Sequence, residues 1–135
     1  MRRLAALTAL FLASLLMSDP AAARPQWALV VHGGAGVIAR SDLTPEQERA
    51  YRAALTRVTE AGGAVLARGG SAVDAVETAI KLLEDDPLFN AGRGAVFTSA
   101  GENEMDAAVM DGRDRRAGAV GSLVGIRHPV AAARA

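Results

Sequence analysis

Apolar residues follow two different patterns in the first part of the chain, one typical of a strand and one typical of a helix. Residues 27–31 form a continuous apolar, β-favouring run, which predicts a short strand buried on both faces. A helix-start pattern follows, with Thr44 at the N-cap, Pro45 at the first helical position and Gln47 completing a capping box. Apolar residues then recur at helical spacing and predict an amphipathic helix; they are Tyr51, Leu55, Val58, Val65 and Leu66.

Glycine pairs divide this helical region. Gly62 and Gly63 fall within the helical pattern. Because each glycine weakens a helix by about 1 kcal/mol, we expect a close packing point or a kink at this pair. Gly69 and Gly70 are expected to end the first helix.

A second helix is predicted to begin at Ser71, which stands at the N-cap with Asp74 three residues later. Pro87 predicts that this helix has ended by about Asp86, because a proline disfavours the helical conformation of the residue before it. Apolar residues at helical spacing mark the expected buried face; they are Val73, Val76, Ala79, Ile80 and Leu83.

Alternating residues after Pro87 predict two hairpins. The first pairs residues 95–98 with residues 104–110, and the second turns at Asp111-Gly112 and returns through residues 117–126. Pro129 then marks the start of a third helix, of which the sequence holds the first turn. We therefore expect the chain to be the front part of a longer protein.

The first residues form a separate unit. Arg2 and Arg3 precede the weakly polar to apolar run 4–17, and Ala21-Ala22-Ala23 provides an A-x-A cleavage site. This layout predicts a secretory signal peptide over residues 1–23, with an uncleaved membrane anchor as the alternative. The mature protein is then expected to be exported, either periplasmic or secreted, and free of the membrane once the signal is cleaved.

Composition narrows the classes of protein that remain. The 135 residues include no cysteine, 50% hydrophobic residues and 4% aromatic residues, which favours a small globular domain over a disulfide-stapled or disordered chain. Lys plus Arg equals Asp plus Glu at 15 each, so no overall basic charge attracts nucleic acid. Two histidines without cysteine do not provide a zinc-binding spacing.

The motif HGGAG at residues 32–36 directly follows the first predicted strand. Glycines there can adopt positive φ. Because they have no side chain, their backbone N–H groups can also approach a ligand and stabilise developing negative charge. The alternative is a tight strand-to-loop turn. A similar loop builds the oxyanion hole of α/β-hydrolase esterases, but those enzymes need a G-x-S-x-G elbow that this sequence lacks.

A second motif covers residues 83–112 and reads LEDDPLFNAGRGAVFTSAGENEMDAAVMDG. The backbone must bend sharply after Pro87 and leaves carbonyls that need partners, for which a hard cation is one solution. Alternatively, Glu84, Asp85 and Asp86 are a solvated acidic helix end. The acidic series Glu104, Asp106 and Asp111 suggests either a carboxylate pair or a polar strand face near a turn; these alternatives stay open.

These two motifs, in this order and spacing, resemble the plant-type L-asparaginase/isoaspartyl peptidase family of N-terminal-nucleophile hydrolases. The resemblance implies an α+β fold, the four-layer αββα sandwich, incomplete in this chain. Residues 24–135 would be the N-terminal part of its α-subunit domain, truncated at the C-terminus. It further implies an (αβ)2 assembly with a β-subunit cut from the same precursor, and no cofactor for catalysis.

The implied reaction hydrolyses L-asparagine to L-aspartate and ammonia, and cleaves isoaspartyl (β-aspartyl) peptides. Its nucleophile is a threonine that autocleavage exposes as a new N-terminus, with the freed α-amine as base. The resemblance places that threonine beyond Ala135, so the chain alone is expected to be inactive, poorly folded and aggregation-prone. A non-enzymatic exported binding or structural domain on the same scaffold, and an esterase-like fragment, are the alternatives.

The resemblance also assigns roles to individual residues. His32, Gly33 and Gly34 would support the nucleophile from their loop, and Asn90 would point toward the active centre. The alternatives are a packing role for His32 and a turn role for Asn90 that exploits its tolerance of left-handed geometry. His128 is expected to cap a helix. A structural sodium ion would be bound by the backbone carbonyls of Leu83, Glu84, Asp86, Phe89, Ala91 and Arg93.

Overall fold

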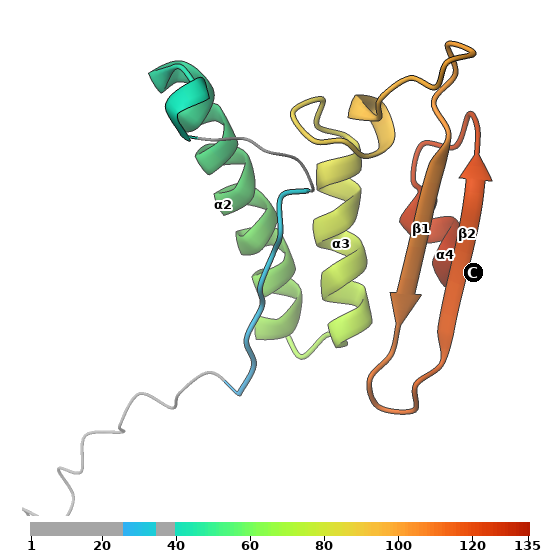
Figure 1. Ribbon diagram of the computed structural model, residues 1–135. Helices are drawn as coiled ribbons and strands as arrows, with labels where there is room; N and C mark the ends of the chain where they lie inside the picture. The colour runs from blue at the N-terminus through green and yellow to red at the C-terminus, as the bar shows by residue number, and fades with distance from the viewer. Residues whose placement is uncertain (1–25, 35–39) are drawn as a thin grey trace, which may run out of the picture.

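A computed structural model describes residues 26–34 and 40–135 (Figure 1). The predicted signal peptide and the last two residues of the HGGAG motif, Ala35 and Gly36, lie outside the described residues. The elements in chain order are η1 (Arg40–Asp42), α2 (Pro45–Ala67), α3 (Ala72–Glu84), η2 (Gly92–Gly94), β1 (Met105–Met110), β2 (Ala117–Leu123) and α4 (Pro129–Arg134).

Both long helices begin with the capping boxes that the sequence predicts. The Thr44 hydroxyl accepts a hydrogen bond from the Gln47 backbone N–H at 3.2 Å, and the Gln47 side chain accepts one from the Thr44 N–H at 2.8 Å. Ser71 and Asp74 make the same reciprocal pair at the start of α3. Each cap contributes about 1 kcal/mol by satisfying N–H groups that have no partner within the helix.

The glycine pair in α2 is a close packing point, which is one of the two predicted alternatives, and not a kink. The helix continues through Gly62 and Gly63, and both are buried. A Cβ atom on Gly62 would lie 2.7 Å from a methyl group of Leu29 and 3.1 Å from the Ala75 carbonyl oxygen. The absence of a side chain therefore lets α3 and the extended segment 26–34 approach α2 closely.

A small core joins α2, α3 and the loop that follows α3. Val58 is fully buried and Phe89 is 4% exposed. The rings of Tyr51 and Phe89 meet edge to face, with centroids 5.9 Å apart. The buried members of the core are Ala54, Val58, Ala79, Leu83 and Phe89.

The predicted buried face of α3 is wrong at one position. Val76 is 39% exposed, whereas the adjacent Ala75 is fully buried. The Ala75 carbonyl also lies against Gly62, where the helices meet most closely. A small residue is required at that contact, so α3 turns Ala75 inward and leaves the larger Val76 outside.

The second predicted hairpin forms. Strands β1 and β2 pair antiparallel, from Met105 opposite Leu123 to Met110 opposite Ala117. Helix α4 begins at the predicted Pro129 and packs behind this hairpin (Figure 1). A Cβ atom on Gly118 would overlap the Ala133 carbonyl oxygen, so glycine is needed in β2 for α4 to lie this close.

Two predicted strands are absent from the described residues, and a third is shorter than expected. Residues 27–31 are extended without forming a strand, and the 91% exposure of Val30 contradicts burial on both faces. No strand pairs with this segment in the described part of the chain. Residues 95–98 also form no strand, so the first predicted hairpin is wrong. Strand β2 ends at Leu123, before Gly125, whose φ is +72°.

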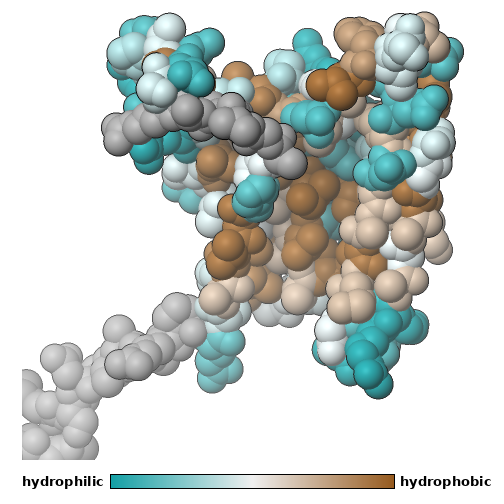
Figure 2. All heavy atoms as spheres, in the orientation of Figure 1, coloured by the Kyte–Doolittle hydropathy of each residue, from teal (hydrophilic) through white to brown (hydrophobic). Residues whose placement is uncertain are grey.

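Apolar side chains remain on the surface of the described chain. Figure 2 shows them gathered over α3 and the extended segment beside it. Large hydrophobic residues that are exposed include Trp27, Val30, Val96, Phe97 and Met110. None of the helices within residues 26–34 and 40–135 has the length and apolar character required to cross a bilayer.

Substitutions in the glycine pair test the close contact. Gly62→Ala forces Leu29 and the Ala75 backbone apart, so we expect the free energy of unfolding to fall by about 1 kcal/mol despite the gain in helix propensity. Gly63→Ala, whose Cβ would lie at an ordinary 3.4 Å from the Trp27 ring, should raise it by up to about 1 kcal/mol. Thermal unfolding of the full-length gene product measures both, and equal stabilisation by both substitutions would contradict the contact.

Candidate functional site

The HGG loop lies against the helical core. A Cβ atom on Gly33 would lie 3.3 Å from both Leu55 and the Phe89 ring. Gly34 has φ +117°, a conformation that favours glycine, and its N–H donates to His32 Nδ1 at 3.2 Å. The loop is therefore next to Phe89, the residue that directly precedes Asn90.

The loop after α3 folds back on itself through short-range hydrogen bonds. The Asp86 carboxylate accepts from the Leu88 N–H at 3.1 Å, and the Asp86 carbonyl accepts from the Phe89 N–H at 3.2 Å. The Phe89 carbonyl in turn accepts from the Ala91 N–H at 2.8 Å. The turn η2 closes the loop when the Gly94 N–H donates to Ala91.

Two glycines in this loop each lie close to a backbone carbonyl oxygen. A Cβ atom on Gly92 would overlap the Glu84 carbonyl oxygen, and one on Gly94 would overlap the Phe89 carbonyl oxygen. Backbone N–H groups already donate to four of the six carbonyls predicted to bind sodium, but a carbonyl oxygen has a second lone pair; the four are Leu83, Asp86, Phe89 and Ala91. An all-oxygen donor set of this kind fits a hard cation.

Side chains do not form an alternative metal site. Within residues 26–34 and 40–135, the structure brings together no group of three or more His, Asp or Glu side chains that could hold an ion. This finding concerns side-chain ligands only. The sodium ligands implied by the resemblance are backbone oxygens, which it does not test.

Glu84 is buried rather than solvated. Only 3% of the residue is exposed, and its carboxylate accepts from the Val130 N–H at 2.9 Å and contacts His128 Nδ1 at 3.1 Å. The prediction of a solvated acidic helix end is therefore wrong for this residue. His128 occupies the N-cap position of α4, as predicted, but its side chain makes no capping hydrogen bond and contacts Glu84 instead.

The neighbouring carboxylates are paired with arginines. Arg127 binds Asp85 through two hydrogen bonds of 2.9 and 3.0 Å, and these bonds lower the pKa of the Asp85 carboxyl below its usual value. Arg57 binds Asp86 at 2.8 Å. Cationic side chains therefore compensate for the unfavourable position of these carboxylates at a helix C-terminus. The carboxylates at the end of α3 therefore do not by themselves require a metal ion.

Asn90 is held by the segment that follows η2. Its Oδ1 atom accepts a hydrogen bond from the Val96 N–H at 2.9 Å, and the residue itself is exposed. Among the described residues, only Arg115 and Ser122 have positive φ besides glycines. The explanation of Asn90 as a left-handed turn residue is therefore wrong. Its side chain organises the loop through hydrogen bonding.

A small pocket of about 200 Å³ contains Asn90. It also brings together two of the predicted acidic residues, Glu104 and Asp106. Asp106 is exposed on β1 and accepts from the Ser122 N–H at 2.8 Å, which supports the polar strand face as its role. Asp111 lies elsewhere, at the hairpin turn, where Arg113 lowers the pKa of its carboxyl to about 2.

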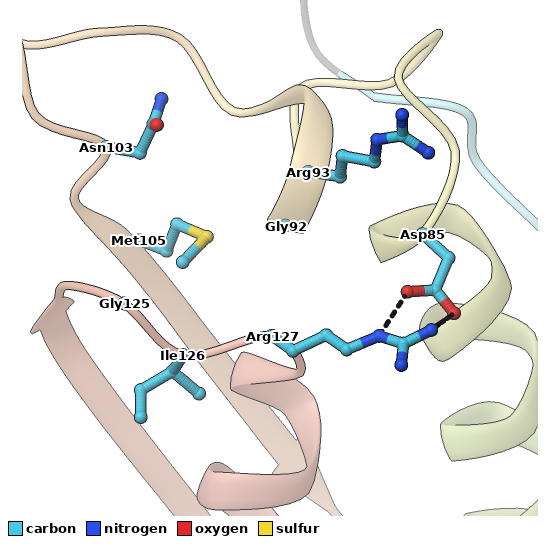
Figure 3. Close-up of a pocket in the computed structure, with 8 residues that line it drawn as sticks. All are labelled: Asp85, Gly92, Arg93, Asn103, Met105, Gly125, Ile126 and Arg127. Carbon is cyan, nitrogen blue, oxygen red and sulfur yellow. Dashed lines mark hydrogen bonds and ion pairs between the residues drawn. The ribbon is translucent and has the colours of Figure 1, made fainter.

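A larger pocket of about 600 Å³ lies between η2, the start of β1 and the connection from β2 to α4 (Figure 3). The Asp85–Arg127 ion pair spans one side of it, and Arg93 extends above that pair in the same view. His32, Gly33, Gly34 and Asn90 do not line this pocket. The structure therefore separates the larger cavity from the side chains that the sequence singles out.

Sequence reasoning missed three residues that hold this region together: Asp85 as an ion-pair partner, Arg127 and Asn103. Asn103 donates through Nδ2 to the carbonyls of Ala95 and Val96. Asp85 and Arg127 are 42 residues apart in sequence, and Asn103 lies in the connection of the first predicted hairpin. No local pattern marks them.

The chain is similar to known hydrolases over most of its length. A family model described as asparaginase matches residues 25–135. The isoaspartyl peptidase of Salmonella typhimurium is 52% identical over 106 residues, which cover 78% of this chain and 34% of that protein. The isoaspartyl peptidase of Escherichia coli is 49% identical over 106 residues, 78% of this chain and 33% of that protein.

A plant-type L-asparaginase of Pyrococcus abyssi is 48% identical over 107 residues, which cover 79% of this chain and 33% of that protein. The chain therefore spans about a third of the length of these curated relatives.

Glu84 offers a test of the contact between α3 and α4. Glu84→Ala leaves the buried Val130 N–H without an acceptor, so we expect the free energy of unfolding to fall by about 2 to 3 kcal/mol. Glu84→Gln keeps an oxygen acceptor and should cost less. The matched control Asp85→Asn weakens a more exposed ion pair and should change the free energy of unfolding much less than Glu84→Ala does. Denaturant unfolding of the full-length protein distinguishes these outcomes, and equal losses in Glu84→Ala and Asp85→Asn would contradict the assignment.

Proposed function

Because this chain belongs to the asparaginase family, we propose that it is the N-terminal portion of an amidohydrolase that converts L-asparagine to L-aspartate and ammonia and cleaves isoaspartyl peptides. The names and identities of its relatives support this proposal. The observation that carries it is the family match over residues 25–135, which includes both motifs. The packing of Gly33 against Phe89 brings these motifs side by side.

The proposed nucleophile is a threonine outside this chain, exposed as an N-terminus when the precursor cuts itself. Its hydroxyl oxygen attacks the amide carbon while its own α-amine accepts the hydroxyl proton. An α-amine suits this task because its usual pKa is about 7.7 to 8.0. Ammonia, or an amine in a peptide substrate, leaves with a proton, and water then hydrolyses the threonine ester to release the acid.

The residues of this chain have supporting roles in that proposal. The Gly34 N–H is bonded to His32 Nδ1, which fixes the loop, and the Gly33 N–H is the group proposed to stabilise negative charge on an attacked carbonyl oxygen. The Oδ1 atom of Asn90 accepts from the Val96 N–H, which orients the amide, and the NH2 group at its other end is proposed to hold the nucleophile. None of these groups transfers a proton in the reaction.

The same proposal extends to the whole protein. Residues 24–135 contribute strands and helices to an αββα sandwich, completed by a β-subunit from the same precursor in an (αβ)2 assembly. Exposed apolar residues such as Phe97, at 72%, support this because a folded protein rarely leaves many of them uncovered. Residues 1–23 act as a signal peptide, and the mature protein is periplasmic or secreted.

A structural sodium ion completes the proposed site. The carbonyls that would bind it are those of Leu83, Glu84, Asp86, Phe89, Ala91 and Arg93. The close approach of the Glu84 carbonyl to Gly92 and of the Phe89 carbonyl to Gly94 supports this assignment. When bound, the ion supplies a positive charge that fixes the loop without taking part in bond breaking.

Ammonia release tests the function. We expect the full-length gene product to cut itself into two chains and to release ammonia from L-asparagine and the free amino acid from β-aspartyl dipeptides. Gel electrophoresis and an ammonia assay measure these events. A folded full-length protein that stays uncut and inactive on both substrates would contradict the proposal and favour a non-enzymatic exported domain.

Salt exchange tests the sodium ion. Binding to the folded state alone raises stability with ligand concentration, so the unfolding midpoint of the full-length protein should be higher in sodium chloride than in choline chloride at equal ionic strength. Gly94→Ala, which crowds the Phe89 carbonyl, should abolish the difference. Gly112→Ala is the matched control, because a Cβ atom there has no neighbour within 4 Å. Equal midpoints for the wild type in both salts would exclude the site.

A further inference from the structure

Two asparagine side chains hold one peptide group from opposite ends. The Val96 N–H donates to Asn90 Oδ1 at 2.9 Å. The Ala95 carbonyl, which belongs to the same peptide group, accepts from Asn103 Nδ2 at 2.5 Å. Asn103 Nδ2 also reaches the Val96 carbonyl at 3.2 Å. The Ala95–Val96 peptide group therefore has both its donor and its acceptor bound by asparagine amides.

The chemistry of the partners determines which way each amide is turned. A backbone N–H can only donate, so the atom of Asn90 that meets Val96 must be the oxygen. Carbonyls can only accept, so the atom of Asn103 that meets Ala95 and Val96 must be the nitrogen. Because the Val96 N–H holds the oxygen end of this amide, the NH2 group of Asn90 points away from the Ala95–Val96 peptide group and is the end available as a donor.

A tight turn brings Asn103 back to this peptide group. The Thr98 N–H donates to the Glu102 carbonyl at 2.8 Å, and the Gly101 N–H donates to the Thr98 carbonyl at 3.0 Å. Gly101 has φ +80°, which favours glycine. Asn103 is half-buried and lies above Met105, just before β1, in the view of Figure 3. The backbone of Asn103 therefore lies two residues before the regular strand β1.

We propose that Asn103 is a positioning residue: through the Ala95–Val96 peptide group it fixes the direction in which Asn90 presents its NH2 group. This inference rests on the proposed function, in which that NH2 group holds the nucleophile. Asn103 itself does not touch the substrate. Without its donor the peptide group is free to rotate, the Val96 N–H leaves Asn90 Oδ1, and the Asn90 amide loses its orientation.

Kinetics of the full-length, self-cleaved protein test this inference. Asn103→Asp keeps the shape of the side chain but places an oxygen against two carbonyl oxygens. We expect kcat for L-asparagine to fall about 10- to 100-fold with KM little changed, because the nucleophile is misplaced rather than the substrate released. Asn103→His should restore most of kcat, since its Nδ1–H can donate from a similar position. Glu102→Ala, which truncates the exposed side chain of the neighbouring residue, is the matched control and should retain wild-type kcat.

A double-mutant cycle separates positioning from a general loss of structure. If Asn103 acts through Asn90, then Asn103→Asp should cause no further loss of kcat in an Asn90→Ala background. A residue that only stabilises the fold would lower activity by a similar factor in both backgrounds. Thermal unfolding of the same variants shows whether the fold is retained.

Several results would overturn the inference. Wild-type kcat in Asn103→Asp would do so, as would an equal loss in the Asn90→Ala background. If Asn103→Asp does not fold, Asn103→Ala and Asn103→His are compared instead, and equal kcat in these two variants counts against positioning. A wild-type protein that releases no ammonia refutes the proposed function itself, whereas an active wild type with an indifferent Asn103 refutes only the inference.

Discussion

The burial of Phe89 is the contact on which the loop after α3 depends. The ring is 4% exposed, meets Tyr51 of α2 edge to face and lies against the HGG loop at Gly33. Burying an aromatic ring of this size stabilises a fold by roughly 2 to 3 kcal/mol, more than any single hydrogen bond within the loop. Because Phe89 is anchored, the adjacent Asn90 has a defined place relative to the glycine loop, although the two are far apart in sequence.

Ion pairs and hydrogen bonds of the carboxylates at the end of α3 also hold the start of this loop in place. Helix C-termini disfavour carboxylates, yet three occur in succession at Glu84, Asp85 and Asp86. Each carboxylate binds a different part of the chain. Glu84 binds the first turn of α4, Asp85 binds Arg127 just before α4, and Asp86 binds Arg57 of α2. The helix end is therefore a junction where an unfavourable local arrangement is offset by long-range contacts.

Local patterns predicted the parts of the fold that local interactions determine. Both helix N-caps and the hairpin turning at Asp111-Gly112 are confirmed, because caps and short turns need only nearby residues. The close packing at Gly62 is also confirmed, although the sequence did not identify its distant partners Leu29 and Ala75. The pairings of Glu84, Asp85 and Asp86 with residues far along the chain could not be predicted, since nothing in a sequence states which distant charge will meet them. The roles given to His32, Gly33, Gly34 and Asn90 came from the resemblance alone, and the structure shows only that their loops are neighbours.

The first predicted hairpin fails because of the hydrogen bonds that hold the Ala95–Val96 peptide group between Asn90 and Asn103. A strand over residues 95–98 would need a partner strand for its N–H and carbonyl groups. Here, the Asn90 and Asn103 side chains take the N–H of Val96 and the carbonyls of Ala95 and Val96, so the backbone is satisfied without a ladder. The alternating pattern remains in the sequence, but its apolar members Val96 and Phe97 are left 66% and 72% exposed. Side-chain amides therefore override strand propensity at this point, and the same bonds that abolish the strand orient Asn90.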